Sequence, residues 1–259
     1  ELDHLSTRLI RDFSSVLPPA VSGSPEERKI NFLSRALAAF AVHKLGGCDL
    51  VDAANAVVDG DADGGIDAVY YSPNANILWV VQSKFMAQGR GEPALGDVSK
   101  FRDGIENLLT GQFDLFRRNP AWAKRLPEIE RCFQDRSLNV KAVLVYSGIN
   151  VVSDDRHNIF ENLIRRFKHG DDFLVFQHYN LTSIHLWVTD ELENALVEKA
   201  SLEVLFPGWT LEPYETIYGL VRLVDIAALQ REYGDQLVSA NIRLYKGTTE
   251  VNKRIVDTL

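Results

Sequence analysis

The chain has 259 residues, 46% of them hydrophobic and 25% charged, which is enough for one large globular domain or two small ones. The formal net charge of −8 argues against a protein that binds nucleic acid by bulk electrostatics, but it does not exclude a nuclease whose acidic residues hold a metal ion. No apolar run approaches the roughly 20 residues of a membrane span. The two cysteines, Cys48 and Cys132, suit a reducing compartment, so we expect a cytoplasmic protein without a membrane partner.

The N-terminal part of the chain predicts two helices. Residues 1–17 have a helical pattern, which the proline-rich stretch "LPPAVSGSP" ends. A second helix is expected to begin after Ser24, because Ser24 can cap it, Pro25 occupies the first helical position and Glu27 completes a capping box. The pair Gly46 and Gly47 is expected to end this helix.

The middle of the chain alternates predicted strands with predicted helices. A hairpin is expected from strands at 66–71 and 77–85, joined by the turn "SPNAN". The other expected elements are helices at 97–118, 120–133 and 153–167 and strands at 140–148 and 172–181. This alternation predicts an α/β fold in which a mixed β-sheet is flanked by helices.

The C-terminal part has a different texture, so we expect one domain at residues 1–212 and the start of a second at 213–259. The last residues keep a helical spacing through Val251, Ile255 and Leu259 without a C-cap, and the chain does not start with Met. Both features predict that the second domain is a truncated, helical segment of a longer protein.

The segment "VVDGDADGGIDAVYY", residues 57–71, places four aspartates and three glycines between apolar residues. The pattern D-x-D-x-D-G that begins at Asp59 matches the start of an EF-hand calcium loop, but the twelfth position of that loop is Tyr70 instead of a bidentate Glu. The residues that follow also favour a strand where an EF-hand needs a helix. We therefore expect Asp59, Asp61 and Asp63 to form a turn, with Asp63 as the one that could assist a neighbouring site.

The second strand of the hairpin, "ILWVVQSKF", carries polar residues in an apolar sequence. Alternation places Gln82 and Lys84 on one face and Ser83 on the other. A four-residue turn would put Asp67 of the first strand directly opposite Gln82. Because a buried lysine is unfavourable unless it has a function, we expect Asp67, Gln82 and Lys84 to line one cleft.

An aspartate, a second oxygen donor and a lysine on one sheet face suit the hydrolysis of a phosphodiester bond. Carboxylate and amide oxygens are ligands that Mg²⁺ accepts. The metal lowers the pKa of a bound water and offsets charge on the attacked phosphate. The lysine ammonium group can orient the nucleophile and stabilise the transition state.

The motif "GGID" with "QSK" about fifteen residues later resembles the core of the PD-(D/E)xK nuclease superfamily, in the D…QxK variant of Mrr-like restriction enzymes. Together with "LWVVQSKF" and the C-terminal "NIRLYKGTTEVNKRIVDTL", it resembles the abortive-infection phage-resistance (AIPR) proteins. The resemblance implies a restriction-endonuclease-like core over roughly residues 24–190. It also implies cleavage of DNA in antiphage defence, with Mg²⁺ as cofactor and Mn²⁺ as a substitute. The preference for DNA over RNA is left open.

Carried over by position, the resemblance implies that Asp67 binds the metal and that Lys84 is the catalytic lysine. Gln82 stands where the superfamily more often has Asp or Glu, so the metal would contact either the Gln82 side chain or the Ser83 carbonyl, with one formal charge fewer. The further acid of the superfamily lies on the first core helix, where Glu27 is the candidate although its capping role alone explains it.

Glu26 is the second candidate for that helix acid. Taken together, the motifs and the resemblance predict that the protein is a Mg²⁺-dependent endonuclease. The alternative is a catalytically inactive nuclease-fold module that binds nucleic acid or partner proteins. The oligomeric state is left open, with a homodimer as one alternative.

Overall fold

The structure is a computed structural model that describes residues 1–167, 173–194, 201–210 and 216–233. The chain forms two compact units, Glu1–Trp187 and Val188–Leu259. The boundary expected at residues 212 and 213 falls inside the second unit. The predicted helical end of the chain lies outside the described residues.

The first unit is built from the following helices and strands. The helices that begin in it are α1 (Leu2–Phe13), α2 (Pro25–Gly46), α3 (Leu50–Asn55), α4 (Leu95–Leu109), the 3-10 helix η1 (Phe113–Leu115), α5 (Pro120–Cys132), α6 (Asp154–Arg166) and α7 (Leu181–Asn194). The strands are β1 (Ala68–Ser72), β2 (Ile77–Lys84), β3 (Asn139–Tyr146) and β4 (Leu174–Tyr179).

The four strands form one mixed sheet in the order β1-β2-β3-β4. The pair β1 and β2 is antiparallel, whereas β2 with β3 and β3 with β4 are parallel. Ser72 pairs with Ile77 and Ala68 with Val81, so the predicted four-residue turn is correct. The pairing ends at Ala68 and Val81, and the Asp67 amide donates to the carbonyl of the same Val81 at 2.8 Å, so the register does not continue to the expected pair of Asp67 with Gln82.

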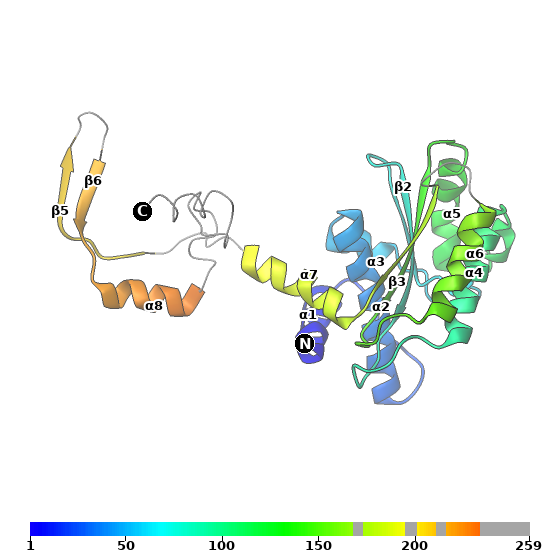
Figure 1. The fold of residues 1–259 in the computed structure, drawn as a ribbon, viewed down its shortest axis with the longest axis horizontal. Helices are drawn as coiled ribbons and strands as arrows, with labels where there is room; N and C mark the ends of the chain where they lie inside the picture. The colour runs from blue at the N-terminus through cyan, green and yellow to red at the C-terminus, as the bar shows by residue number, and fades with distance from the viewer. Residues whose placement is uncertain (168–172, 195–200, 211–215, 234–259) are drawn as a thin grey trace. The chain divides into compact units, whose positions relative to one another are not determined.

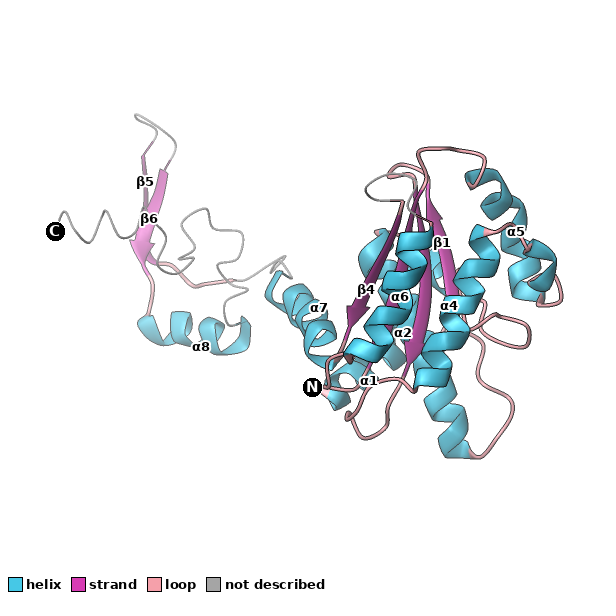
Figure 2. Cartoon of the chain, turned by 45° about the vertical axis from the view of Figure 1, so that its right-hand side comes forward, coloured by secondary structure: helices cyan, strands magenta, loops and turns pink. Residues whose placement is uncertain are grey.

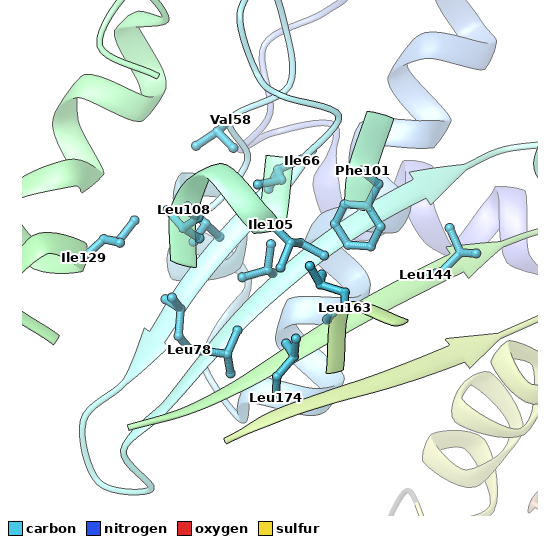
Figure 3. Packing of buried hydrophobic residues seen from close by; sticks show 14 of the residues in the cluster. Val58, Ile66, Leu78, Phe101, Ile105, Leu108, Ile129, Leu144, Leu163 and Leu174 are labelled. Atoms are coloured by element: carbon cyan, nitrogen blue, oxygen red, sulfur yellow. The ribbon is translucent and has the colours of Figure 1, made fainter. Parts of the chain in front are cut away.

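Helices cover both faces of this sheet, with α1, α2 and α3 on one side and α4, α5 and α6 on the other (Figures 1 and 2). The core between the sheet and the second group of helices is apolar (Figure 3). Phe101, Ile105 and Leu108 of α4 are fully buried there, together with Leu78 and Leu144 of the strands. Burial of these large side chains is the main stabilising contribution that the fold provides. The expected α/β fold with a mixed sheet flanked by helices is confirmed.

Several predicted elements have different ends in the structure. The helix expected at 97–118 starts at Leu95 and ends at Leu109, because Gly111 adopts a positive φ of 73° before the chain turns into η1. The helix expected at 120–133 is α5, which continues through Pro127. The strand expected at 172–181 is shorter, and the residues after it form α7, which the sequence analysis did not predict.

The second unit contains β5 (Leu205–Thr210), β6 (Thr216–Leu220) and α8 (Leu223–Tyr233). β5 and β6 pair antiparallel, with an irregularity between Leu205 and Gly208. In neither unit does a described helix combine the length and the apolar character that a membrane crossing requires.

Candidate metal and catalytic site

Asp63 organises the Asp-rich loop that connects α3 to β1. Its Oδ1 accepts a hydrogen bond from the Gly65 amide at 2.7 Å, and its Oδ2 accepts one from the Gly60 amide at 3.2 Å. Nζ of Lys100, on α4, also donates to Oδ1 at 2.8 Å, and this hydrogen bond raises the pKa of Lys100. Asp63 therefore forms the turn, as expected, and ties the loop to α4.

The loop is not an EF-hand. Its second flank is β1, and Tyr70, at the position that would carry the bidentate Glu, lies within that strand. An EF-hand requires a helix at this place. The expectation that the segment is no calcium loop of this kind is confirmed.

Asp67 lies one residue before β1, and Ser83 fixes its carboxylate. Asp67 Oδ2 accepts a hydrogen bond from the Ser83 amide at 2.7 Å and lies 3.1 Å from Ser83 Oγ. Ser83 Oγ also lies 2.8 Å from the carbonyl oxygen of Ser34 on α2, so its single hydrogen has two acceptors within reach. Burial and then the nearby charge of Asp59 raise the pKa of Asp67 to about 7. Asp67 is therefore partly protonated at neutral pH.

Asp67 opens onto a cavity of about 320 Å³ beside the C-terminal end of β2. The lining residues are Ile30, Asn31, Ser34 and Arg35 of α2, together with Asp59, Asp67, Ser83, Lys84 and Phe85. The structure thus brings together three residues that the sequence analysis selected, namely Asp67, Ser83 and Lys84.

Lys84 is the last residue of β2, and its surroundings differ from those expected. Its Nζ lies 2.8 Å from Oδ2 of Asp97 on α4, and its side chain is 48% exposed. The premise that this lysine is buried is wrong, because the strand ends here and the ammonium group reaches water. The presence of Lys84 is therefore not an argument for catalysis by itself.

Gln82 does not line the cavity. Its Nε2 donates to the Asp97 carbonyl at 3.1 Å, on the α4 side of the sheet, whereas Ser83 meets α2 on the other side. Gln82 Oε1 is buried without a hydrogen-bond partner among the described residues. The prediction that Gln82 shares a cleft with Asp67 is therefore wrong.

The reason is an irregularity at the start of β1. Ile66 and Val69 both belong to the core on the α4 side, although strict alternation would put them on opposite faces. The intervening Asp67 is consequently not held on the face that the strand period assigns to it. Its carboxylate is directed toward Ser83 instead.

The acid expected from the first core helix is also absent from the cavity. The Glu27 carboxylate accepts a hydrogen bond from the Ser24 amide at 2.7 Å, and the Glu27 amide donates to Ser24 Oγ at 3.3 Å. This capping box lowers the pKa of Glu27. Neither Glu27 nor Glu26 lines the cavity, so the prediction that one of them turns toward Asp67 is wrong.

The capping geometry predicts the outcome of a conservative substitution. Glu27→Gln should leave the affinity for divalent metal unchanged and lower the melting temperature only slightly, because glutamine can complete the same capping box but lacks the negative charge that the helix N-terminus favours. Ser24→Ala should lower the stability by about 1 kcal/mol without changing metal affinity. Thermal unfolding and calorimetric titration with Mn²⁺ measure the two quantities. A clear loss of metal affinity in Glu27→Gln would restore Glu27 as a ligand.

Asp59 was expected only to form a turn, but it lines the cavity beside Asp67. One carboxylate oxygen from each of Asp59, Asp63 and Asp67 lies within 4.8 Å of the others. Burial and then the charge of Asp63 raise the pKa of Asp59. A bridge between Val57 and Ala68, and hydrogen bonds from the Val58 and Asp59 amides to the Asp67 carbonyl, bring the two segments together. The apolar pair Val57 and Val58 directly before Asp59 fits a short extended segment, but it does not indicate that Asp59 lies near Asp67.

Comparison of the chain with protein-family models, with curated proteins and with solved structures gave no match. The resemblance of the sequence motifs to a nuclease superfamily therefore stays a prediction. The cavity and the residues that line it are the structural basis for assigning a chemistry to this chain.

Proposed function

We propose that this chain is a Mg²⁺-dependent phosphodiester hydrolase that acts as an endonuclease on DNA. The observation that carries the proposal is that Asp59, Asp67 and Lys84 line one cavity, so that two carboxylates lie beside the lysine at the end of β2. Carboxylates for a divalent cation, with a lysine beside them, are the groups that metal-assisted attack on a phosphodiester uses.

The donor atoms fit a hard divalent cation. Asp67 Oδ1 and the Asp59 carboxylate accept no hydrogen bond from the described residues, whereas both oxygens of Asp63 are engaged by the loop. Burial raises the pKa of both Asp59 and Asp67, helped by the charge of Asp63 at Asp59 and by the charge of Asp59 at Asp67, so their negative charges lack full compensation. Asp59 and Asp67 would hold the ion, and oxygen ligands favour Mg²⁺ or Mn²⁺. When bound, the ion supplies an activated water and offsets charge on the phosphate.

Ser83 and Asp97 orient the side chains of Asp67 and Lys84. The Ser83 amide and hydroxyl fix one oxygen of Asp67 and leave the other free to face the cavity. The Asp97 carboxylate pairs with the Lys84 ammonium group at the C-terminal end of β2. From there the ammonium group can stabilise negative charge that develops on a phosphate. The pKa of Asp67 near 7 makes metal binding compete with one proton.

The choice of DNA and of a role in prokaryotic antiphage defence rests on the resemblance of "GGID…QSK" and the C-terminal motif, not on the site. RNA shares the phosphodiester that the cavity would recognise. A test of the proposal must therefore offer both nucleic acids.

A catalytically inactive nuclease-fold module is the second candidate, and two observations favour it. α2 contributes Asn31, Ser34 and Arg35 to the cavity but no carboxylate, and Gln82 faces α4. The metal would then have two protein carboxylates at most. The inactive module predicts nucleic-acid binding without cleavage.

The deciding experiment incubates the protein with supercoiled plasmid and with RNA, in Mg²⁺, in Mn²⁺ or in EDTA. We expect cleavage that requires the metal. Lys84→Ala should reduce the rate about a hundredfold to a thousandfold, because the charge it stabilises develops only in the transition state. Metal affinity should stay the same or rise slightly, since a positive charge leaves the cavity.

Lys124→Ala is the matched control, because Lys124 is an exposed lysine on α5 outside the cavity. It should cleave at the wild-type rate. Cleavage by Lys84→Ala at that same rate would contradict the proposed mechanism. Binding of DNA in Ca²⁺ without any cleavage in Mg²⁺ would favour the inactive module.

A further inference from the structure

The cavity contains a second cation that the proposed function has not used. Arg35, on α2, lines the cavity opposite the end of β2 that carries Lys84. Its Nη1 donates to the carbonyl of Pro18 at 2.9 Å, and its side chain is 18% exposed. Its Nε lies 4.0 Å from Asp59 Oδ2, too far for a hydrogen bond. The guanidinium group is therefore anchored at one nitrogen and keeps further N–H donors for a ligand.

The turn of α2 that carries Arg35 is fixed to β2 by its neighbour Ser34. Ser34 Oγ accepts a hydrogen bond from the Phe85 amide at 2.9 Å, and the Ser34 carbonyl lies 2.8 Å from Ser83 Oγ. These contacts hold Arg35 at a set position relative to Lys84 and Asp67. A preorganised guanidinium group loses little conformational entropy when it binds an anion.

The charges of the lining predict when an anion can bind. Two cationic side chains, Arg35 and Lys84, and two anionic ones, Asp59 and Asp67, line the cavity, so their formal charges cancel. A bound divalent cation would make the lining positive. The cavity should then attract a singly charged phosphodiester, and a guanidinium group matches the geometry of its two non-bridging oxygens.

We propose that Arg35 is a phosphate-binding residue of this site and contacts the non-bridging oxygens of the phosphodiester once a divalent cation occupies the cavity. The inference rests on the proposed metal site and adds a role for α2, which would bind the substrate instead of the metal. It assigns recognition to the sugar–phosphate backbone of the nucleic acid, and not to its bases.

The test measures binding of a short fluorescent duplex DNA in Ca²⁺ at several salt concentrations, for the wild type, Arg35→Met and Arg35→Lys. We expect Arg35→Met to weaken binding about tenfold and to reduce the slope of log affinity against log salt by about 0.9, the value for one phosphate contact. Arg35→Lys should keep the salt slope and lose part of the affinity for DNA. Lysine keeps the positive charge but lacks the paired N–H donors with which a guanidinium group binds two oxygens. Calorimetric affinity for Mn²⁺ should not fall in either variant.

Arg28→Met is the matched control. Arg28 lies on the same helix and also donates to a backbone carbonyl, that of Gly23 at 3.1 Å, but it is exposed and does not line the cavity. It should leave affinity and slope unchanged. An unchanged slope in Arg35→Met, or an equal loss in Arg28→Met, would overturn the inference.

Further outcomes distinguish a loss of phosphate binding from a folding defect and from a loss of hydrolase activity. Arg35→Lys retains the cation if Arg35→Met proves unstable, and a wild-type slope with wild-type affinity in Arg35→Met overturns the inference whatever the activity. Wild-type cleavage with an unchanged KM in Arg35→Met would remove the role of Arg35 while the proposed hydrolase stands. Metal-dependent DNA binding that needs Arg35, without cleavage, would support the inference and contradict the hydrolase.

Discussion

Asp67→Asn is expected to abolish metal binding and cleavage while making the metal-free protein more stable at pH 8. Asparagine keeps an oxygen that can accept the hydrogen bonds from the Ser83 amide and hydroxyl. It removes the charge that burial and Asp59 make unfavourable. Loss of a ligand and gain of stability in one substitution are the mark of a carboxylate retained for a cation rather than for folding.

The raised pKa of Asp67 determines how the stability of the metal-free protein changes with pH. The pKa of Asp67 is about 7 in the folded protein against 3.8 for an unperturbed aspartate, so the folded state binds more protons between these two values. Stability of the metal-free wild type should therefore fall as the pH rises from about 4 to about 7. The two pKa values correspond to at most about 4 kcal/mol, and because the carboxylate faces an open cavity we expect about 1 to 4 kcal/mol.

Urea unfolding of both proteins in EDTA at pH 5 and pH 8 measures this difference. Asp67→Asn should exceed the wild type at pH 8 and approach it at pH 5, and Mg²⁺ should stabilise only the wild type. Asp61→Asn, an exposed aspartate of the same loop outside the three-carboxylate cluster, is the control and should show neither effect. A variant less stable than the wild type at pH 8 would contradict the raised pKa.

Gly104→Ala is expected to destabilise the protein by about 3 kcal/mol. At an exposed position inside a helix, the same substitution usually stabilises a protein. A Cβ at Gly104 would lie 2.1 Å from the carbonyl oxygen of Gly64, a backbone atom that cannot move without moving the loop. The loop holds Asp59 and Asp63, so metal affinity should fall as well.

Gly96→Ala is the matched control in the same helix. A Cβ at Gly96 would meet nothing within 4 Å, so this variant should be as stable as the wild type or more stable by up to about 1 kcal/mol. Urea unfolding and titration with Mn²⁺ compare the two variants. Equal stability of Gly104→Ala and Gly96→Ala would mean that α4 does not pack directly on the Asp-rich loop.

Much of the fold could be predicted because its signals are local. The capping box at Ser24, the four-residue turn of the hairpin and the alternation of strands and helices depend on residues close in sequence, and the structure contains all three. The ends of α4 and β4 were less predictable, since a single glycine conformation or the packing of the next helix moves them.

The candidate site was predicted only in part. Asp67, Ser83 and Lys84 do line one cavity, but Asp67 reaches it through the irregularity at the start of β1 and not through the register that the turn length sets. Gln82 and Glu27 were placed wrongly, since their side chains find closer partners in the Asp97 carbonyl and the Ser24 amide.

By itself, the sequence determined the fold class, the hairpin and the position of Asp67 beside β2, because these follow from short-range periodicity and turn length. Tertiary structure alone decided which side chains meet in the cavity. The bridge of Val57 to Ala68 brings Asp59 to Asp67, and the packing of α2 on the end of β2 adds Arg35. Contacts between segments distant in sequence leave no periodic pattern in either segment, so only the folded chain reveals them.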